Sequence, residues 1–326
     1  MLSEVMDYFG FDKELDHLGF FATDEHTHLE KELPRIIRQG RLVALSGIVG
    51  SGKTTTLQSL QHNLKQGKDV IVSRSLAVDK ERVSLGTLIA ALFYDLSTEK
   101  DFKLPTQPEK RERKLLELIQ KCHKPVVLFV DDAHGLHNQT LVGLKRLIEL
   151  VRQGRETLSV VLAGHPKLKN DLRRPILEEI GARARLFTLE GIRGRQREYI
   201  EWVLKEATSE ARQPTELLTS EALVFLAERL ATPLQIEQYL TLAFEAAHRV
   251  GQKPVTIDIL ETTLAHGLDD LEPHLVRQGY NAKILAELLN VRPSEVRSFL
   301  HGQLPPGRTQ ELREQMLRIG IPLLAS

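Results

Sequence analysis

The segment Gly47–Thr54 reads G-I-V-G-S-G-K-T and constrains this chain more than any other feature. It matches the phosphate-binding loop pattern G-x-x-x-x-G-K-[ST] at every fixed position. The apolar run Leu42–Leu45 precedes it, and a helical pattern from Thr54 to Lys65 follows. Such a loop turns successive backbone N–H groups toward phosphate oxygens, and the helix N-terminus adds partial positive charge. The segment therefore predicts a nucleotide site rather than a chance glycine-rich turn.

Each position of this loop has an expected role. Lys53 is predicted to reach the outer phosphates, and Thr54 is predicted to hold Mg2+. The expected cofactors are therefore ATP and Mg2+. The residues predicted to contact the nucleotide are Gly47, Gly50, Ser51, Gly52, Lys53, Thr54 and Thr55.

A second element of a nucleotide-hydrolysing site is a carboxylate at the end of a buried strand. The apolar run Val126–Val130 is followed directly by Asp131 and Asp132. Asp131 is predicted to be a second metal ligand, and Asp132 is predicted to orient or activate the attacking water. The alternative is a strand that ends in a solvated turn.

Two further catalytic candidates follow in the sequence. His165 comes after the apolar run Ser159–Ala163 and could sense the terminal phosphate, or could be a loop histidine without a catalytic role. Sites of this type are often completed by an arginine from a neighbouring subunit. The candidates for this role are Arg173, Arg174, Arg183 and Arg185, and a solvated arginine is the alternative for each.

Short apolar runs alternate with amphipathic helical patterns over the first 190 residues. The expected strands are Leu42–Leu45, Val70–Val72, Val126–Val130, Val160–Leu162 and Leu186–Leu189. This alternation predicts an α/β fold with a mainly parallel sheet covered on both faces. From about Gly194 only helical patterns remain. The predicted domains are 1–193 for nucleotide binding with an N-terminal extension, 194–271 as a helical lid and 272–326 as a small all-α domain.

The last segment carries a different signal, because two short amphipathic patterns flank the turn Asn290–Arg292. Burial of Ala286, Val291, Val296 and Leu300 would give the packing of a helix-turn-helix. Arg292, Ser294 and Arg297 would then face outward and could contact DNA. Residues 272–326 hold seven Lys and Arg against five Asp and Glu, which is compatible with DNA contact. A protein-docking module is the alternative.

Composition limits the classes of function. The 326 residues are 41% hydrophobic and 27% charged, with a formal net charge of zero, so any DNA contact must come from local patches. Lys80 and Arg82 are two further candidates for such contact. No apolar run approaches the roughly 20 residues that span a bilayer. The single cysteine, Cys122, fits a reducing compartment, so we expect a cytoplasmic protein without a membrane partner.

Four runs together resemble a known family. The phosphate loop, Asp131-Asp132-Ala133-His134, and Leu162-Ala163-Gly164-His165-Pro166-Lys167-Leu168 are similar to AAA+ ATPases of the ExeA type, as is the early Tyr8-Phe9-Gly10-Phe11. That group is close to the transposition regulators TnsC, TniB and MuB, and the resemblance covers about residues 5–265. It implies an αβα nucleotide domain with a helical lid, and ATP-dependent oligomerisation as a ring or filament, commonly on duplex DNA.

The resemblance also assigns roles by position. It implies that Lys53, Thr54 and Asp131 hold phosphate and Mg2+, that His165 is the polar sensor and that Arg183 acts in a neighbouring subunit. Asp132 stands where the family usually has glutamate, and a shorter arm implies slow ATP hydrolysis. The lid run Ala231–Gln235 lacks the arginine that the family usually places there.

These observations favour a DNA-binding ATPase that oligomerises on duplex DNA and selects or delivers a target site to a transposase. Its expected partners are duplex DNA, a transposase, target-selection proteins and further copies of itself. Two alternatives stay open: a cytosolic secretion-type ATPase that acts on protein partners, and a DNA-binding regulator that uses ATP only as a switch.

Overall fold

A computed structural model describes residues 1–76, 83–97, 104–181, 183–208, 213–264 and 270–323. Five strands form one sheet in the order β2-β3-β4-β1-β5, and every pair within it is parallel. The strands are β1 Leu42–Ser46, β2 Ile71–Arg74, β3 Val126–Val130, β4 Leu158–Gly164 and β5 Arg185–Thr188. The predicted α/β fold with a parallel sheet is confirmed, and each expected strand lies within a few residues of an observed one.

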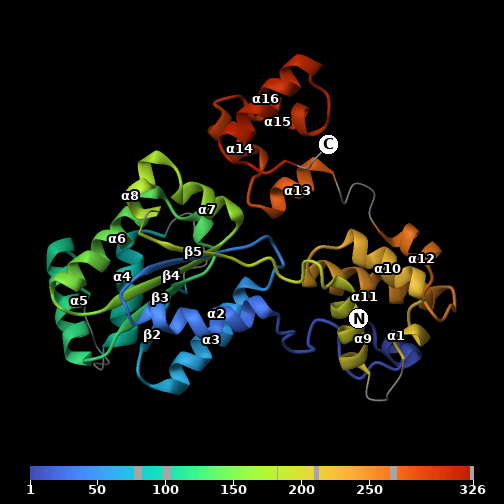
Figure 1. Cartoon of the computed structure of the whole chain (residues 1–326), viewed down its shortest axis with the longest axis horizontal. Coiled ribbons are helices and arrows are strands. Elements are labelled where there is room, and N and C mark those ends of the chain that lie inside the picture. Colours follow the sequence, from blue (N-terminus) through green and yellow to red (C-terminus); the bar gives the residue numbers. More distant parts are fainter. Residues whose placement is uncertain (77–82, 98–103, 182, 209–212, 265–269, 324–326) are drawn as a thin grey trace.

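Helices cover both faces of this sheet (Figure 1). Along β1, Ala44 belongs to one hydrophobic cluster, whereas Val43 and Leu45 belong to the other. This alternation follows from the two-residue period of a strand, which sends successive side chains to opposite faces. The helices on the first face include α4 Leu85–Leu96, α5 Pro108–Cys122 and α6 Asn138–Gln153, and those on the second are α2 Asp24–Ile37 and α3 Lys53–Gly67.

A separate helical cluster follows the sheet, as the sequence predicted. It contains α9 Gln196–Ala207, α10 Ser220–Arg229, α11 Pro233–Arg249 and α12 Ile257–Thr263. The N-terminal helix α1, Ser3–Phe9, also packs here, because Val5, Phe9, Phe11 and Leu15 share its core. The sequence prediction grouped these first residues with the nucleotide domain, and their contacts are with the lid helices. The boundaries at 193 and 271 stay predictions.

The last part of the chain has its own small core around Leu275, Leu285 and Val296. Its helices are α13 Leu271–Arg277, α14 Ala282–Leu289, α15 Pro293–Leu300 and α16 Pro306–Arg318. The expected buried face is present: Ala286 and Val296 are buried, and Val291 and Leu300 pack partly buried against the same core. None of the described helices is long and apolar enough to cross a membrane.

Candidate nucleotide-binding site

The phosphate loop connects β1 to α3, at the carboxyl edge of the sheet. Gly50 and Gly52 have φ angles of 79° and 87°, a region that side-chain-bearing residues rarely adopt. A Cβ on Gly47 would lie 2.4 Å from Ser51 Oγ, and one on Gly50 would lie 2.7 Å from Leu234 Cβ. Glycine is therefore needed at 47 and 50 because the loop folds on itself and packs against the start of α11.

Lys53 begins α3 and is 7% exposed. Its Nζ donates to the carbonyl oxygens of Gly47 at 2.9 Å and Ile48 at 2.8 Å, which holds the ammonium over the loop. Burial lowers the pKa of Lys53, and the negative charges of Asp131 and Asp132 oppose that shift. An anion bound in the loop would supply the charge that this buried ammonium lacks.

Two hard oxygen ligands meet at the end of β3. Thr54 Oγ1 donates to Asp131 Oδ2 at 2.8 Å, although the two residues are 77 positions apart in the chain. The other oxygen of Asp131 accepts the backbone N–H of Asp132 at 2.9 Å. Hydroxyl and carboxylate oxygens are the ligands that Mg2+ takes from proteins, so this pair fits the predicted ion.

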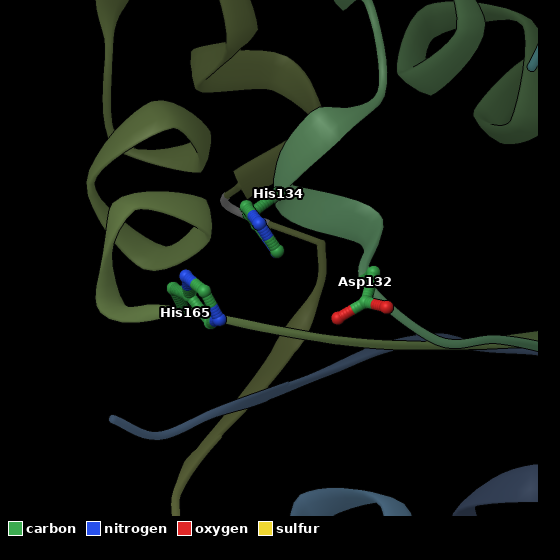
Figure 2. Close-up of side chains that lie close together, drawn as sticks. All are labelled: Asp132, His134 and His165. Carbon is green, nitrogen blue, oxygen red and sulfur yellow. The ribbon is translucent and has the colours of Figure 1, made fainter. Parts of the chain in front are cut away.

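Asp132 points elsewhere. It has a φ angle of 53° and is exposed, and it leads into the short 3-10 helix Ala133–Gly135 that carries His134. Figure 2 shows its carboxylate at the end of the strand, on the side where His134 and His165 lie. The ligand atoms of these three side chains lie within 4.8 Å of one another. Asp132 is therefore available to a water molecule at the edge of the phosphate site.

His134 and His165 are stacked, with ring centroids 3.8 Å apart and an interplanar angle of 13° (Figure 2). The Nδ1 atom of each ring is buried and has no hydrogen-bond partner among the described residues. Burial lowers the pKa of both, that of His165 to about 4, so both rings are neutral at neutral pH. A metal ion bonds about 2.0–2.1 Å from an imidazole nitrogen. It lies in the ring plane, so two nearly parallel rings cannot share one without turning.

The remaining sequence candidates lie away from this centre. Arg183 precedes β5 and lies at the amino-terminal ends of the strands, whereas the phosphate loop lies at their carboxyl ends. Its Nη1 donates to Glu149 at 2.6 Å. In its own chain it therefore cannot reach the phosphate loop, and a role in a neighbouring subunit stays a prediction. Arg292, Ser294 and Arg297 are exposed around the start of α15. Lys80 and Arg82 lie outside the described residues.

The sequence reasoning missed contacts between the phosphate site and the end of the chain. The backbone N–H of Val49, inside the phosphate loop, donates to the carbonyl of Arg277 at 3.0 Å. Gly279 lies so close to His165 that a Cβ on it would be 2.9 Å from the histidine Cβ. The local sequence shows only that Gly279 is a glycine, a residue that allows a positive φ angle. It does not indicate which distant residue Gly279 contacts. The stack of His134 on His165 was also missed, because it too joins residues that are distant in sequence.

Part of this chain is similar in sequence to known proteins. Residues 36–172 match the family of AAA domains. General secretion pathway protein A of Aeromonas hydrophila is 31% identical over 153 residues, which cover 44% of this chain and 26% of that protein. The matched part is thus about a quarter of that relative's length.

Two of the similar solved structures match most of this chain. Cdc6p from Pyrobaculum aerophilum has a TM-score of 0.53 at 16% identity, covering 97% of this chain and 90% of that one. The Orc1 protein of Aeropyrum pernix, solved in complex with DNA, has a TM-score of 0.52 at 14% identity, covering 94% of this chain and 86% of that one. At these identities the likeness concerns the fold. Residues 36–172 thus match the AAA domain family, and the chain has the α/β fold of the P-loop AAA+ ATPases.

Proposed function

We propose that this protein is an ATP-dependent DNA-binding regulator that oligomerises on duplex DNA and delivers a target site to a transposase. The ATP dependence of DNA binding rests on one observation, the direct contact between the phosphate loop and the C-terminal helices. The Val49 N–H donates to the Arg277 carbonyl at 3.0 Å, and beside it the Lys167 N–H at the start of α7, Pro166–Leu172, donates to the Gln278 carbonyl at 3.2 Å. A conformational change of the phosphate loop would therefore be transmitted to the C-terminal helices through main-chain hydrogen bonds.

The C-terminal helices offer a surface suited to a polyanion. Arg292 and Arg297 are exposed, and neither forms an ion pair with a described residue, whereas Arg308 is held by Glu295 and Glu311. Ser294 lies in the first turn of α15, beside these arginines. Arginine pairs readily with phosphate, and a short helix that follows a tight turn is the form in which many proteins enter the major groove. We therefore assign DNA contact to Arg292, Ser294 and Arg297.

The nucleotide site supplies the switch. Lys53 would exchange the carbonyls of Gly47 and Ile48 for the outer phosphates, and Thr54 and Asp131 would hold Mg2+. The ion would neutralise charge that develops on the phosphates. Asp132 would take a proton from the attacking water. Its arm is shorter than that of glutamate, so we propose that hydrolysis is slow and that ATP binding drives assembly.

Imaging the purified protein with duplex DNA tests assembly. With a slowly hydrolysed ATP analogue and Mg2+, we expect rings or filaments on the DNA, and without nucleotide we expect none. The Lys53→Ala variant is the matched control and should stay dispersed under both conditions. Absence of nucleotide-dependent assemblies of the wild-type protein on DNA would rule out this mechanism.

A second function is favoured by one observation, the 31% identity to general secretion pathway protein A. In that case the ATPase would act on protein partners, and its turnover would respond to a protein and be indifferent to DNA. Measuring ATP turnover with and without duplex DNA separates the two, because the regulator should respond to DNA. Equal turnover, together with DNA binding that is weak at low salt, would favour the secretion-type function.

A further inference from the structure

The turn between α13 and α14, residues 277–280, lies between the phosphate loop and the start of α7. The Arg277 carbonyl accepts the N–H of Val49 in the loop at 3.0 Å, and the Gln278 carbonyl accepts the N–H of Lys167 at 3.2 Å. The loop follows β1, and α7 follows the neighbouring strand β4. Main-chain atoms of the turn therefore bridge two segments that border the phosphate site.

Two further contacts fix this turn. A Cβ on Gly279 would be 2.9 Å from the Cβ of His165, so a side chain there would displace the turn. Tyr280 is 2% exposed, and its hydroxyl accepts from Asn170 Nδ2 at 2.6 Å. Asn170 Nδ2 also donates to the Gly320 carbonyl at 2.6 Å, just after α16. The C-terminal helices are thus attached to the sheet domain on the side of the site where β4 ends.

The turn engages groups that a terminal phosphate would use. A phosphate loop binds anions through successive backbone N–H groups, and the N–H of Val49 has a protein carbonyl as its acceptor. Hydrogen bonds to a charged acceptor are roughly twice as strong as neutral ones, so a phosphate oxygen competes well for this donor. The same turn lies against His165, the candidate sensor of the terminal phosphate. A nucleoside diphosphate lacks the terminal phosphate and would leave these contacts in place.

We propose that the α13–α14 turn is an autoinhibitory contact, which the terminal phosphate of a nucleoside triphosphate displaces. With the turn docked, the Arg277 carbonyl holds the Val49 N–H, and the C-terminal helices are fixed against the sheet domain. A triphosphate takes that N–H and separates the helices from the site, whereas a diphosphate leaves them docked. This inference rests on the proposed nucleotide site and adds the direction of the coupling: docking of the C-terminal helices and binding of the triphosphate oppose each other.

Hydrogen exchange at one amide reports whether the turn is docked. The N–H of Lys167 lies in the first turn of α7, where the helix itself offers no acceptor, and it donates to the Gln278 carbonyl. Exchange at this amide, resolved by residue in the full chain, should be at least about tenfold faster with Mg2+ and a slowly hydrolysed ATP analogue than without nucleotide or with ADP. Equal or slower exchange with the analogue would overturn the proposal.

Weakening the docking contact should strengthen binding of the triphosphate. Asn170→Ala removes both bonds from Asn170 to the C-terminal helices and leaves the phosphate loop and His165 as they are. Because apparent affinity is reduced by the fraction of protein that is not competent to bind, this variant should bind the ATP analogue at least about threefold more tightly than the wild type. Its affinity for ADP should be unchanged. Tyr280→Phe keeps the buried ring but removes the hydroxyl, and it should change affinity in the same direction by less.

Asn63→Ala is the matched control, because Asn63 Nδ2 bonds to Glu30 at 3.4 Å within the sheet domain. This variant should bind the analogue as the wild type does. If Asn170→Ala and Tyr280→Phe bound the analogue no more tightly than the wild type, the C-terminal helices would not oppose the nucleotide, and the inference would be wrong.

The outcomes also separate this inference from the proposed function. If the analogue released the turn but left the affinity for duplex DNA unchanged, the autoinhibitory contact would stand and the regulator function would fail. If neither the wild type nor Asn170→Ala bound the analogue, the assignment of the phosphate loop would be wrong, and both would fail.

Discussion

Single residues around the phosphate loop are polar or charged groups held in partial burial, and their chemistry follows from their neighbours. Lys53 is buried over carbonyl oxygens, and Asp131 accepts from Thr54. The local sequence predicted that these three residues belong to one site, because the motif pattern fixes both residue type and spacing. It did not predict His134 against His165, since a stack between two loops depends on how the sheet brings their strands together.

Lys53→Ala should weaken nucleotide binding. The buried ammonium is the main positive charge near the outer phosphates, and a charge-assisted hydrogen bond contributes about 1.5–3 kcal/mol, so affinity should fall roughly 10- to 100-fold. Titration with a fluorescent ATP analogue measures it. Lys65→Ala, at the far end of the same helix, is the control and should bind as the wild type does. Equal affinities of wild type and Lys53→Ala would show that the loop does not hold phosphate.

Asp132→Asn should separate binding from turnover. The carboxylate is exposed at the site edge and would act as the base for water, a role that typically contributes about 100-fold or more to rate. Nucleotide affinity should be unchanged while single-turnover hydrolysis slows by about that factor. Normal turnover in this variant would mean that another residue activates the attacking water.

His165 should make stability depend on pH. Its pKa in the folded protein is lowered to about 4, whereas the ordinary value is 6.5. Between these values the unfolded chain takes up a proton that the folded chain excludes, so stability should fall as the pH drops from 6.5 to 4 and then level off. Denaturant midpoints of the wild type and His165→Asn, measured across this range, test it. The variant should lose less stability, and parallel pH profiles would refute the assignment.

At the scale of elements, the strands that carry the site were predictable from short apolar runs, because strands buried on both faces lack polar positions. Element ends were less predictable. The helical pattern of the sequence runs from Thr256 to Leu268, whereas α12 runs from Ile257 to Thr263 and residues 265–269 lie outside the described part of the chain. Ser220 has the residue type of an N-cap, but the N-cap of α10 is Thr219, whose side chain accepts the Ala222 N–H. Both neighbouring residues have a hydroxyl group, so sequence alone does not choose between them.

The junction between the phosphate loop and α11 makes its own prediction. Thr232 caps α11, and a Cβ on Gly50 would lie 2.8 Å from Thr232 Oγ1. Gly50→Ala should therefore push the loop away from the lid, in addition to about 1–2 kcal/mol for a side chain at positive φ. Gly251→Ala has the same backbone cost with nothing within 4 Å and serves as the control. ATP affinity should fall only for Gly50→Ala, and equal affinities would contradict the contact.

At the scale of the whole molecule, the chain forms a sheet domain, a lid cluster and a C-terminal cluster (Figure 1). The phosphate loop contacts the other two groups, through Gly50 against Leu234 of the lid and through the Val49 N–H to the Arg277 carbonyl. Asn170 Nδ2 donates to the Tyr280 hydroxyl and to the Gly320 carbonyl, both at 2.6 Å, which adds to the contacts of Val49 and Gly279. Composition and periodicity predict each cluster separately. They do not predict how the clusters pack against one another, because that packing depends on a few hydrogen bonds and close contacts between residues more than 100 positions apart.

Gly279→Ala should loosen the C-terminal helices. Its φ angle is 92°, and the added Cβ would meet His165 at 2.9 Å. Gly302→Ala, also at positive φ but with nothing within 4 Å, is the matched control in the same cluster. Limited proteolysis should release the C-terminal segment faster from Gly279→Ala than from Gly302→Ala. Equal rates would mean that the contact with His165 does not hold the helices in place.

The central claim is that nucleotide at the phosphate loop controls DNA binding by this protein. Fluorescence anisotropy of a labelled duplex, titrated with the full chain at fixed salt, tests it most directly. With Mg2+ and a slowly hydrolysed ATP analogue, the wild-type protein should bind the duplex at least about tenfold more tightly than without nucleotide, and Lys53→Ala should show no such gain. Identical wild-type affinities with and without the nucleotide would contradict the account.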